Sequence, residues 1–243
     1  MASSPLVGAI LAFLLSIVMT ACSSLPGRPG PAPEVGRPGE LMKFGVLYRQ
    51  NCSACHGPDG WGGAAFPLAD PVYLAIVDEA TLRKVVANGI PNSLMPAFAR
   101  SAGGMLTEGQ VDAIVHGMRQ AWAKPGILDG VTPPPYSAPL GDAQRGAGVY
   151  QTFCASCHGP GGKGGAKASS VMDGSYLGLV SDQELRTDVI CGRPRLDAPD
   201  WRSDVPGRPM TAQEVSDVVA FLASKRPPFP GQPYPGRTAG ASQ

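Results

Sequence analysis

The sequence has almost no net charge: the formal charge is +1 at pH 7, and only 16% of its 243 residues are charged. Proteins that bind nucleic acid usually carry a strongly basic face, so nucleic acid is excluded as a partner. Few stretches show the features of β-strands, and we expect an all-α protein. The sequence also has only three histidines, which limits the number of imidazole ligands.

The sequence also has no long hydrophobic run. Residues 6–21 are almost entirely apolar, but they fall short of the roughly 20 residues that a membrane-spanning helix needs. They predict a signal peptide over residues 1–21, and therefore export. The run ends in Met19-Thr20-Ala21-Cys22, which resembles the bacterial lipobox and implies that a lipidated Cys22 anchors the chain on the periplasmic side of the membrane. Without lipidation, the exported chain would be soluble in the periplasm.

Glycine and proline are abundant instead, at 32 and 26 residues, and they predict long loops rather than dense secondary structure. They are concentrated in three segments: a predicted tether at residues 22–40, a linker at 126–140 and a tail at 228–243. Segments of this composition bury too little apolar surface to order themselves. The remaining ranges, 41–125 and 141–227, are long enough for two small domains.

These two ranges repeat one another. Nine residues around a Cys-x-x-Cys-His motif recur at an offset of 102, and two later segments recur at offsets of 103 and 104. The nine are Tyr48, Cys52, Cys55, His56, Gly57, Pro58, Gly60, Gly62 and Gly63, which return as Tyr150, Cys154, Cys157, His158, Gly159, Pro160, Gly162, Gly164 and Gly165. The chain therefore holds two copies of one domain, here called copy one (residues 41–125) and copy two (residues 141–227).

Each copy has the same predicted plan of three helices joined by loops rich in glycine and proline. The first helix leads into the Cys pair, and the second carries apolar residues at helical spacing. The third begins at Thr107 or Thr211. Gln110 and Glu214 follow three residues later, in the pattern of a capping box.

The Cys-x-x-Cys-His motif is the attachment signature of c-type haem. Two thiols three positions apart suit the two vinyl groups of the porphyrin, and the adjacent histidine reaches the iron from the same turn. A redox Cys-x-x-Cys site needs no adjacent histidine and usually occurs in an α/β pattern, which is absent here. A zinc site would need four ligands. The motif therefore predicts two c-type haems. Their predicted thioether positions are Cys52, Cys55, Cys154 and Cys157, and their predicted iron ligands are His56 and His158.

By these residues the chain resembles the class I cytochromes c, and in particular the di-haem cytochromes with two such domains in tandem. The resemblance implies two small domains of helices and long loops, each wrapped around a covalently bound haem. It also implies a sixth iron ligand from a methionine on the proline-bearing loop. In copy one this is Met95, between Pro91 and Pro96, and Met105 is the alternative. A thioether ligand raises the reduction potential, which suits an electron carrier.

Copy two departs from this pattern, because Ala198 stands where copy one has Met95 and alanine cannot bind iron. Met210 is the first candidate for the sixth ligand, although it aligns with a residue expected in the core. Met172 and Cys191 are further candidates. The remaining interpretation is an iron that is open or binds water.

Two functions are compatible with these features. In the first, the chain relays single electrons in an extracytoplasmic respiratory or photosynthetic chain, between a membrane quinol-oxidising or dehydrogenase complex and an oxidase or soluble carrier. In the second, the haem of copy two has an open axial site and acts on a small molecule such as peroxide or a nitrogen or sulfur oxyanion. Catalysis would require an acid or base near the open side of the iron. The remaining histidine, His116, is distant in sequence from the motif of copy two. We therefore favour electron relay, with redox proteins of a membrane complex as partners.

Overall fold

The computed structural model describes residues 37–91, 93–203 and 205–227. The chain divides into two units, Met1–Glu40 and Leu41–Gln243. The predicted signal peptide, Cys22 with most of the tether, and the tail lie outside the described residues. Of the first unit, the structure describes one short 3-10 helix, η1 (Pro38–Glu40). None of the helices in the described ranges is both long and apolar enough to cross a membrane.

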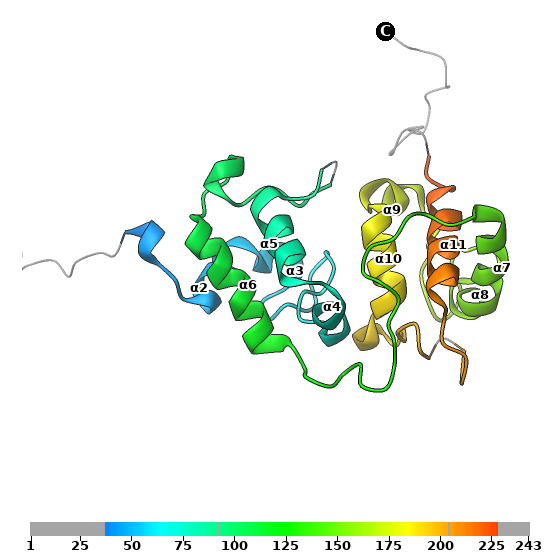
Figure 1. Cartoon of the computed structure of the whole chain (residues 1–243). Coiled ribbons are helices and arrows are strands. Elements are labelled where there is room, and N and C mark those ends of the chain that lie inside the picture. Colours follow the sequence, from blue (N-terminus) through cyan, green and yellow to red (C-terminus); the bar gives the residue numbers. More distant parts are fainter. Residues whose placement is uncertain (1–36, 92, 204, 228–243) are drawn as a thin grey trace, which may run out of the picture. The chain divides into compact units, whose positions relative to one another are not determined.

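The second unit consists of helices and loops (Figure 1). In the described residues there are no strands, only two isolated bridges, Ala99 with Leu106 and Arg193 with Ala198. The all-α prediction is confirmed. The helices of copy one are α2 (Phe44–Asn51), α3 (Ser53–His56), α4 (Pro71–Ile76), α5 (Glu79–Asn88), η2 (Arg100–Ala102) and α6 (Glu108–Trp122). Those of copy two are α7 (Ala143–Phe153), α8 (Ala155–His158), α9 (Gly174–Leu179), α10 (Asp182–Cys191), η3 (Pro194–Leu196) and α11 (Ala212–Ala223).

The predicted capping boxes are both present. The hydroxyl of Thr107 accepts from the backbone N–H of Gln110, and the Gln110 side chain accepts from the backbone N–H of Thr107. Thr211 and Glu214 do the same at the start of α11. Each box satisfies two backbone donors that a helix N-terminus otherwise leaves without intrahelical partners.

The first and last helices of each copy pack closely, because a glycine lies where they meet. A Cβ atom on Gly117 of α6 would lie 2.2 Å from the ring of Phe44 on α2. A Cβ atom on Gly146 of α7 would lie 1.9 Å from the carbonyl oxygen of Asp217 on α11. Larger residues would therefore force these helices apart in either copy. The close packing fixes the end of the first helix, where the Cys-x-x-Cys-His motif begins.

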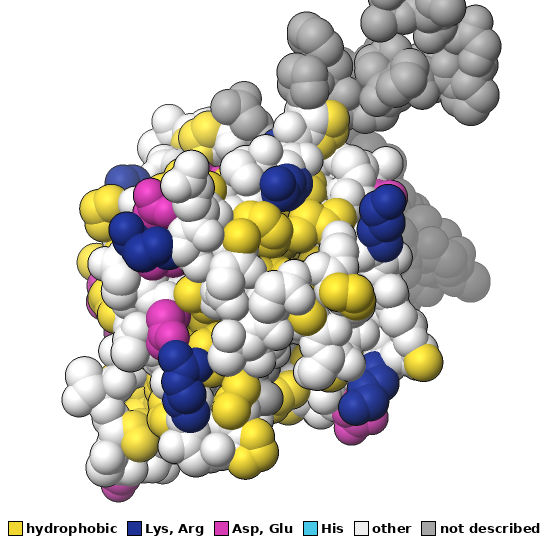
Figure 2. All heavy atoms as spheres, turned by 90° about the vertical axis from the view of Figure 1, so that its right-hand side faces the viewer, with side chains coloured by type: hydrophobic (Ala, Val, Ile, Leu, Met, Phe, Trp, Pro, Cys, Tyr) yellow, Lys and Arg dark blue, Asp and Glu magenta, His cyan; other side chains and the backbone are white. Residues whose placement is uncertain are grey.

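The surface charge is mixed. Figure 2 shows one face of the molecule, on the side where α7 and α8 lie in Figure 1, with basic and acidic side chains spread over it, several of them beside one of opposite charge, and apolar side chains between them. Copy one has seven Lys and Arg against six Asp and Glu, and copy two has ten of each. Neither copy therefore carries the strong single-sign field that steers association over long distances.

Candidate haem-binding sites

The Cys-x-x-Cys-His motif of copy one forms a single helical turn. Cys52 lies at the junction of α2 and α3, and α3 carries Cys55 and His56. The His56 ring is buried, and its Nδ1 lies 2.7 Å from the carbonyl oxygen of Phe66. Since a carbonyl only accepts hydrogen bonds, Nδ1 carries the proton and Nε2 keeps its lone pair for a metal ion. Burial also lowers the pKa of His56, which favours the neutral, metal-binding ring.

Copy two forms the same turn. Cys154 lies at the junction of α7 and α8, and α8 carries Cys157 and His158. The Nδ1 of His158 lies 2.7 Å from the carbonyl oxygen of Ser169, the residue equivalent to Phe66. A hydrogen bond from the second ring nitrogen to a carbonyl is the usual way in which a metal-binding histidine is oriented. Both histidines therefore present Nε2 in the same way.

A tyrosine supports each turn. The Tyr48 hydroxyl donates to the carbonyl oxygen of Gly57 at 2.8 Å, and the Tyr150 hydroxyl donates to that of Gly159 at 2.8 Å. Burial raises the pKa of Tyr48 to about 12 and also raises that of Tyr150, so both hydroxyls remain protonated donors. Both tyrosines belong to the sequence repeat, which by itself indicates no role for them. Their position four residues before the first cysteine of each motif was the available signal.

The glycine after the histidine allows the loop to fold back over the turn. Gly57 has a φ of 83°, and a Cβ atom there would lie 1.7 Å from the carbonyl oxygen of Trp61. Gly159 has a φ of 79°. This left-handed conformation strains other residues, so the glycines recur because the chain must turn sharply just after each histidine.

Met95 lies half-buried on the proline-bearing loop that follows α5. Its carbonyl oxygen accepts from the backbone N–H of Ile90 at 3.0 Å, and its own N–H donates to the Ser93 hydroxyl at 3.1 Å. These bonds fix the backbone on both sides of the sulfur-bearing residue. The side chain of Met105 is 81% exposed. Iron ligation by Met95 stays a prediction.

The corresponding loop of copy two keeps one of these backbone hydrogen bonds but lacks the sulfur. The N–H of Arg193 donates to the carbonyl oxygen of Ala198 at 2.9 Å, as Ile90 does to Met95 in copy one. The rest of the loop differs, because Pro194–Leu196 form η3, Asp197 has a φ of 58°, and the Ala198 N–H donates to the carbonyl oxygen of Arg193 at 3.2 Å. At position 198 the side chain is only a methyl group. The alignment of Ala198 with Met95, inferred from the sequence, holds in three dimensions.

Met210 occupies a core position. It is 3% exposed, and its N–H donates to the carbonyl oxygen of Trp201 at 2.8 Å. In copy one, Leu106 is 6% exposed and donates in the same way to Phe98 at 2.8 Å. Met210 is thus the structural equivalent of Leu106. Its role as sixth ligand stays a prediction, as does the alternative, Met172, which is half-buried in the loop before α9.

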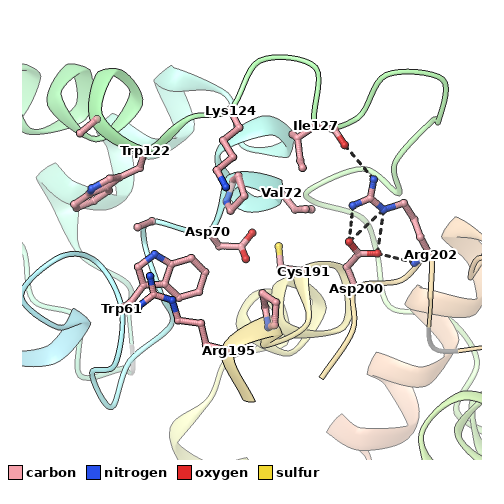
Figure 3. A pocket seen from close by; sticks show the side chains of 14 residues that line it. Trp61, Asp70, Val72, Trp122, Lys124, Ile127, Cys191, Arg195, Asp200 and Arg202 are labelled. Carbon is pink, nitrogen blue, oxygen red and sulfur yellow. Dashed lines mark hydrogen bonds and ion pairs between the residues drawn. The ribbon is translucent and has the colours of Figure 1, made fainter. Parts of the chain in front are cut away.

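The two copies meet at a cleft of about 550 Å³ (Figure 3). Cys191 of copy two and Asp70 of copy one point toward one another across it, and each is 1% exposed. Burial, reinforced by the nearby carboxylates of Asp70, Asp188 and Asp200, raises the pKa of the Cys191 thiol well above its ordinary value. Cys191 is therefore a neutral thiol that lines the contact between the copies.

No group of three or more His, Cys, Asp or Glu side chains that could bind a metal by themselves occurs in the described part of the chain. His116 lies on α6 with its side chain 69% exposed, and its Nδ1 is 3.5 Å from a carboxylate oxygen of Glu79. The histidines of the two turns therefore require a partner that brings its own donors. Haem fits this requirement, because the porphyrin supplies four nitrogens and the adjacent thiols can form its thioether links.

Comparisons with known proteins match both copies to cytochrome families. Residues 143–225 match the family "Cytochrome c", and residues 40–116 match the family "Cytochrome C oxidase, cbb3-type, subunit III". The chain is 29% identical over 151 residues to the cbb3-type cytochrome c oxidase subunit CcoP of Azospirillum sp. strain B510, covering 56% of this chain and 46% of that protein. It is 26% identical over 220 residues to the cytochrome bc1 complex cytochrome c subunit of Mycobacterium bovis, and the match covers 86% of this chain and 74% of that protein.

A solved structure also matches part of the chain. The dihydro-haem d1 dehydrogenase NirN, in complex with DHE, is 33% identical and covers 42% of this chain and 18% of its own, with a TM-score of 0.27. The chain also spans about half the length of the Azospirillum protein, 46%.

The helical fold, the two histidine turns and the two family matches define the class: the chain is a c-type cytochrome. It contains two cytochrome c domains in tandem, and these imply two covalently bound c-type haems. The particular cysteines and ligands of each haem remain those predicted from the sequence.

Proposed function

We propose that this di-haem electron-transfer cytochrome relays single electrons in an extracytoplasmic respiratory or photosynthetic chain. Its donor would be a membrane quinol-oxidising or dehydrogenase complex, and its acceptor an oxidase or a soluble carrier. A lipidated Cys22 would anchor the exported chain to the membrane on the periplasmic side.

The observation that carries this proposal is that both copies hold their histidine in the same way. Two equivalent turns in one chain, each with a histidine bonded to a carbonyl at 2.7 Å, provide two equivalent places for iron. When bound, each haem supplies a one-electron redox couple. The protein's part is to orient each histidine through its carbonyl partner and, in copy one, to bury the ring. A pair of such centres suits relay better than a single reaction site.

The names of the relatives support a membrane complex as the partner. They are a subunit of a cbb3-type oxidase and a subunit of a bc1 complex. The balanced charge of both copies disfavours a partner that is attracted over long distances. An anchor at Cys22 would instead raise the effective concentration of the chain at a membrane partner.

The test uses membranes from cells that produce the full haem-loaded chain, compared with membranes from the same cells without it. Under anaerobic conditions, quinol should reduce the additional c-type haem, and an inhibitor of quinol oxidation should prevent this. Admitting oxygen should then reoxidise the haem. Reduction that is insensitive to the inhibitor, or reduced haem that oxygen leaves unchanged, would contradict a relay from a quinol-oxidising complex to an oxidase.

The anchor has its own test. A Cys22→Ser variant should keep its haem content but move to the soluble fraction after cell lysis. Quinol-dependent reduction should then slow, because the effective concentration at the membrane is lost. A Cys22→Ser chain that stays in the membrane fraction would show that another part of the protein holds it there.

A second function is favoured by one observation. The loop of copy two shares a backbone hydrogen bond with the Met95 loop but presents Ala198, so the loop provides no thioether at this position. If no other sulfur replaces it, the second iron would be open to a small molecule. The carbon monoxide experiment at the end of the Discussion distinguishes this function from relay.

A further inference from the structure

The loop of copy two that lacks the methionine contacts the haem-attachment loop of copy one. The Arg195 guanidinium carbon lies 4.4 Å from the centre of the Trp61 ring. Figure 3 labels both side chains, which lie against one another. The Arg193 guanidinium carbon lies 5.2 Å from the centre of the Phe66 ring. Guanidinium groups within about 6 Å of an aromatic face are attracted to it electrostatically. Two such pairs therefore join the copies.

Both aromatic residues belong to the structure that holds His56. Phe66 supplies the carbonyl oxygen that accepts from His56 Nδ1. The carbonyl oxygen of Trp61 is the atom that a Cβ on Gly57 would meet, directly after the histidine. Copy two thus touches the residues around the first histidine, rather than a distant surface of copy one.

These pairs are specific to the contact, because none of their members recurs in the other copy. The residue equivalent to Trp61 in copy two is Lys163, and the residue equivalent to Phe66 is Ser169. In copy one, the position of Arg193 is taken by Ile90. The aromatic residues occur only in copy one and the arginines only in copy two. The two copies therefore differ in sequence at the positions where they contact one another.

Arg193 is itself held in place. Its Nη2 lies 2.8 Å and its Nε 3.0 Å from Oδ1 of Asp188, whose side chain is 16% exposed. Its backbone N–H and carbonyl both bond with Ala198. The guanidinium is therefore fixed from the side of copy two, and it presents a defined face to Phe66.

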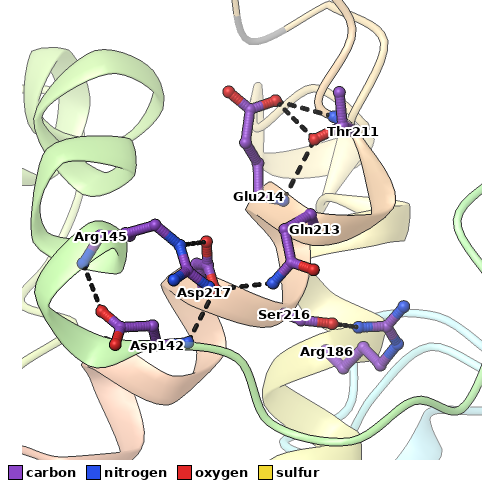
Figure 4. A network of polar contacts seen from close by, with 8 residues as sticks. All are labelled: Asp142, Arg145, Arg186, Thr211, Gln213, Glu214, Ser216 and Asp217. Atoms are coloured by element: carbon purple, nitrogen blue, oxygen red, sulfur yellow. Dashed lines mark hydrogen bonds and ion pairs between the residues drawn. The ribbon is translucent and has the colours of Figure 1, made fainter.

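The linker is also fastened to copy two. Arg186 Nε donates to the carbonyl oxygen of Pro135 at 2.9 Å, and Gln183 Nε2 donates to that of Tyr136 at 2.7 Å. Arg186 Nη1 donates to the Ser216 hydroxyl at 3.0 Å (Figure 4). Two consecutive linker carbonyls are thus bound to α10, which also contacts α4 of copy one.

Arg186 has different partners from its equivalent in copy one. Its equivalent in copy one, Arg83, forms ion pairs with Glu108 and Asp112 on α6. In copy two, those acidic positions are Ala212 and Ser216. Because copy two has no carboxylate at these two positions, the Arg186 guanidinium can donate to the Pro135 carbonyl.

We propose that Arg193 and Arg195 are positioning residues, which dock copy two onto the haem-attachment loop of copy one and hold the two haem centres in one fixed arrangement for direct electron exchange. The part concerning exchange rests on the proposed relay function. In copy one, the equivalent loop carries the predicted Met95 ligand. In copy two, it holds the neighbouring domain.

The experiment uses the full haem-loaded chain with Arg193→Gln and Arg195→Gln combined. The first measurement is the distance distribution between the two ferric haems by pulsed electron paramagnetic resonance. The second is the rate of electron exchange between the haems after flash reduction. The loss of two cation–π pairs should lower the ratio of docked to undocked molecules about 5- to 30-fold, which broadens the distribution and slows exchange.

Arg208→Gln is the matched control, because Arg208 lies 4.6 Å from the Phe153 ring within copy two and its loss removes a similar pair and charge. It should leave the distance distribution unchanged. Arg195→Lys, made alone in the wild-type chain, keeps the positive charge above Trp61. This variant should retain most of the wild-type exchange rate. Haem content and far-ultraviolet circular dichroism verify that each variant is folded.

An unchanged distance distribution or an unchanged exchange rate in the double variant would overturn the proposal. So would equal broadening in Arg208→Gln, because the effect would then come from lost charge or stability rather than from docking. Failure of the relay itself is distinguishable. In that case the distance distribution of the wild-type chain would still be narrow, but quinol-oxidising membranes would not reduce its haems.

Discussion

Replacing Asp217 by asparagine should loosen copy two and leave copy one intact. The Asp217 carboxylate on α11 accepts four hydrogen bonds from the first and last helices of its domain (Figure 4). They come from the Asp142 N–H at 2.7 Å, from Arg145 Nε and Nη2 at 2.8 Å each, and from Gln213 Nε2 at 2.9 Å. The pairing with Arg145, more than any other contact, lowers the pKa of Asp217 to about 2.

The pKa shift sets the size of the effect. A fall from 3.8 to about 2, at roughly 1.36 kcal/mol per pKa unit, corresponds to about 2.4 kcal/mol of folding free energy. Because the Arg145 side chain is 60% exposed, solvent screening reduces this to about 1–2 kcal/mol. A carboxyl whose folded pKa is lowered stabilises the protein above its unfolded pKa. The contribution is therefore complete at pH 7 and is lost as the pH falls from about 4 to 2.

Hydrogen-exchange mass spectrometry can resolve the two copies. In the haem-loaded Asp217→Asn chain at pH 7, peptides from α7 and α11 should exchange about 5- to 30-fold faster, while those from α2 and α6 remain unchanged. Asp129→Asn is the control, since this linker carboxyl is exposed. In urea titrations, the stability difference from the wild type should shrink between pH 4 and 2. A difference of equal size at pH 7 and pH 2 would refute the ionic origin.

Three further predictions concern other parts of the fold. Gly117→Ala should lower the unfolding free energy of copy one by about 1–3 kcal/mol, measured by urea titration, because the new Cβ would lie 2.2 Å from the ring of Phe44. Thr211→Ala should lower that of copy two by about 1 kcal/mol and speed hydrogen exchange in the first turn of α11, because the hydroxyl that accepts from Glu214 N–H is lost. The Cys191 thiol, with its raised pKa, should react with iodoacetamide at pH 8 at least about tenfold more slowly in the native than in the unfolded chain. Equal rates would contradict its burial.

Much of each domain could be predicted from the sequence, because the signals are local. The Cys-x-x-Cys-His motif predicted the histidine turn, and Thr107 and Thr211 predicted the starts of α6 and α11. The short helices α4 and α9 were missed, because six residues are too few to show helical periodicity. Asp70 and Asp173, which cap these helices, were the available signal.

The contact between the copies could not be predicted in the same way. Trp61 and Arg195 are 134 positions apart, and no local pattern relates one to the other. Neither residue belongs to a helix with an apolar face whose partner could be inferred. The repeat contained an indirect signal. Trp61 of copy one has no aromatic equivalent in copy two, and Arg195 of copy two has no basic equivalent in copy one. Only the structure shows that these differences meet.

The sixth ligand of the second haem can be settled by two substitutions. Ala198→Met places a sulfur at the position that shares the backbone hydrogen bond of Met95, so the variant should gain a thioether charge-transfer band from the second haem and lose any binding of carbon monoxide there. If the band does not increase and carbon monoxide still binds, the two loops are not equivalent in function.

Met210→Leu is the complementary variant. Leucine is the residue at the equivalent position, Leu106, and a Met-to-Leu change nearly conserves volume, so packing should be kept while the sulfur is lost. If Met210 is the ligand, the second thioether band should disappear and carbon monoxide should bind to half of the haem. If the spectrum is unchanged and the wild-type chain already binds carbon monoxide at one haem, Met210 is a core residue only. The second iron would then be open, and a reaction with a small molecule would become the better account of copy two.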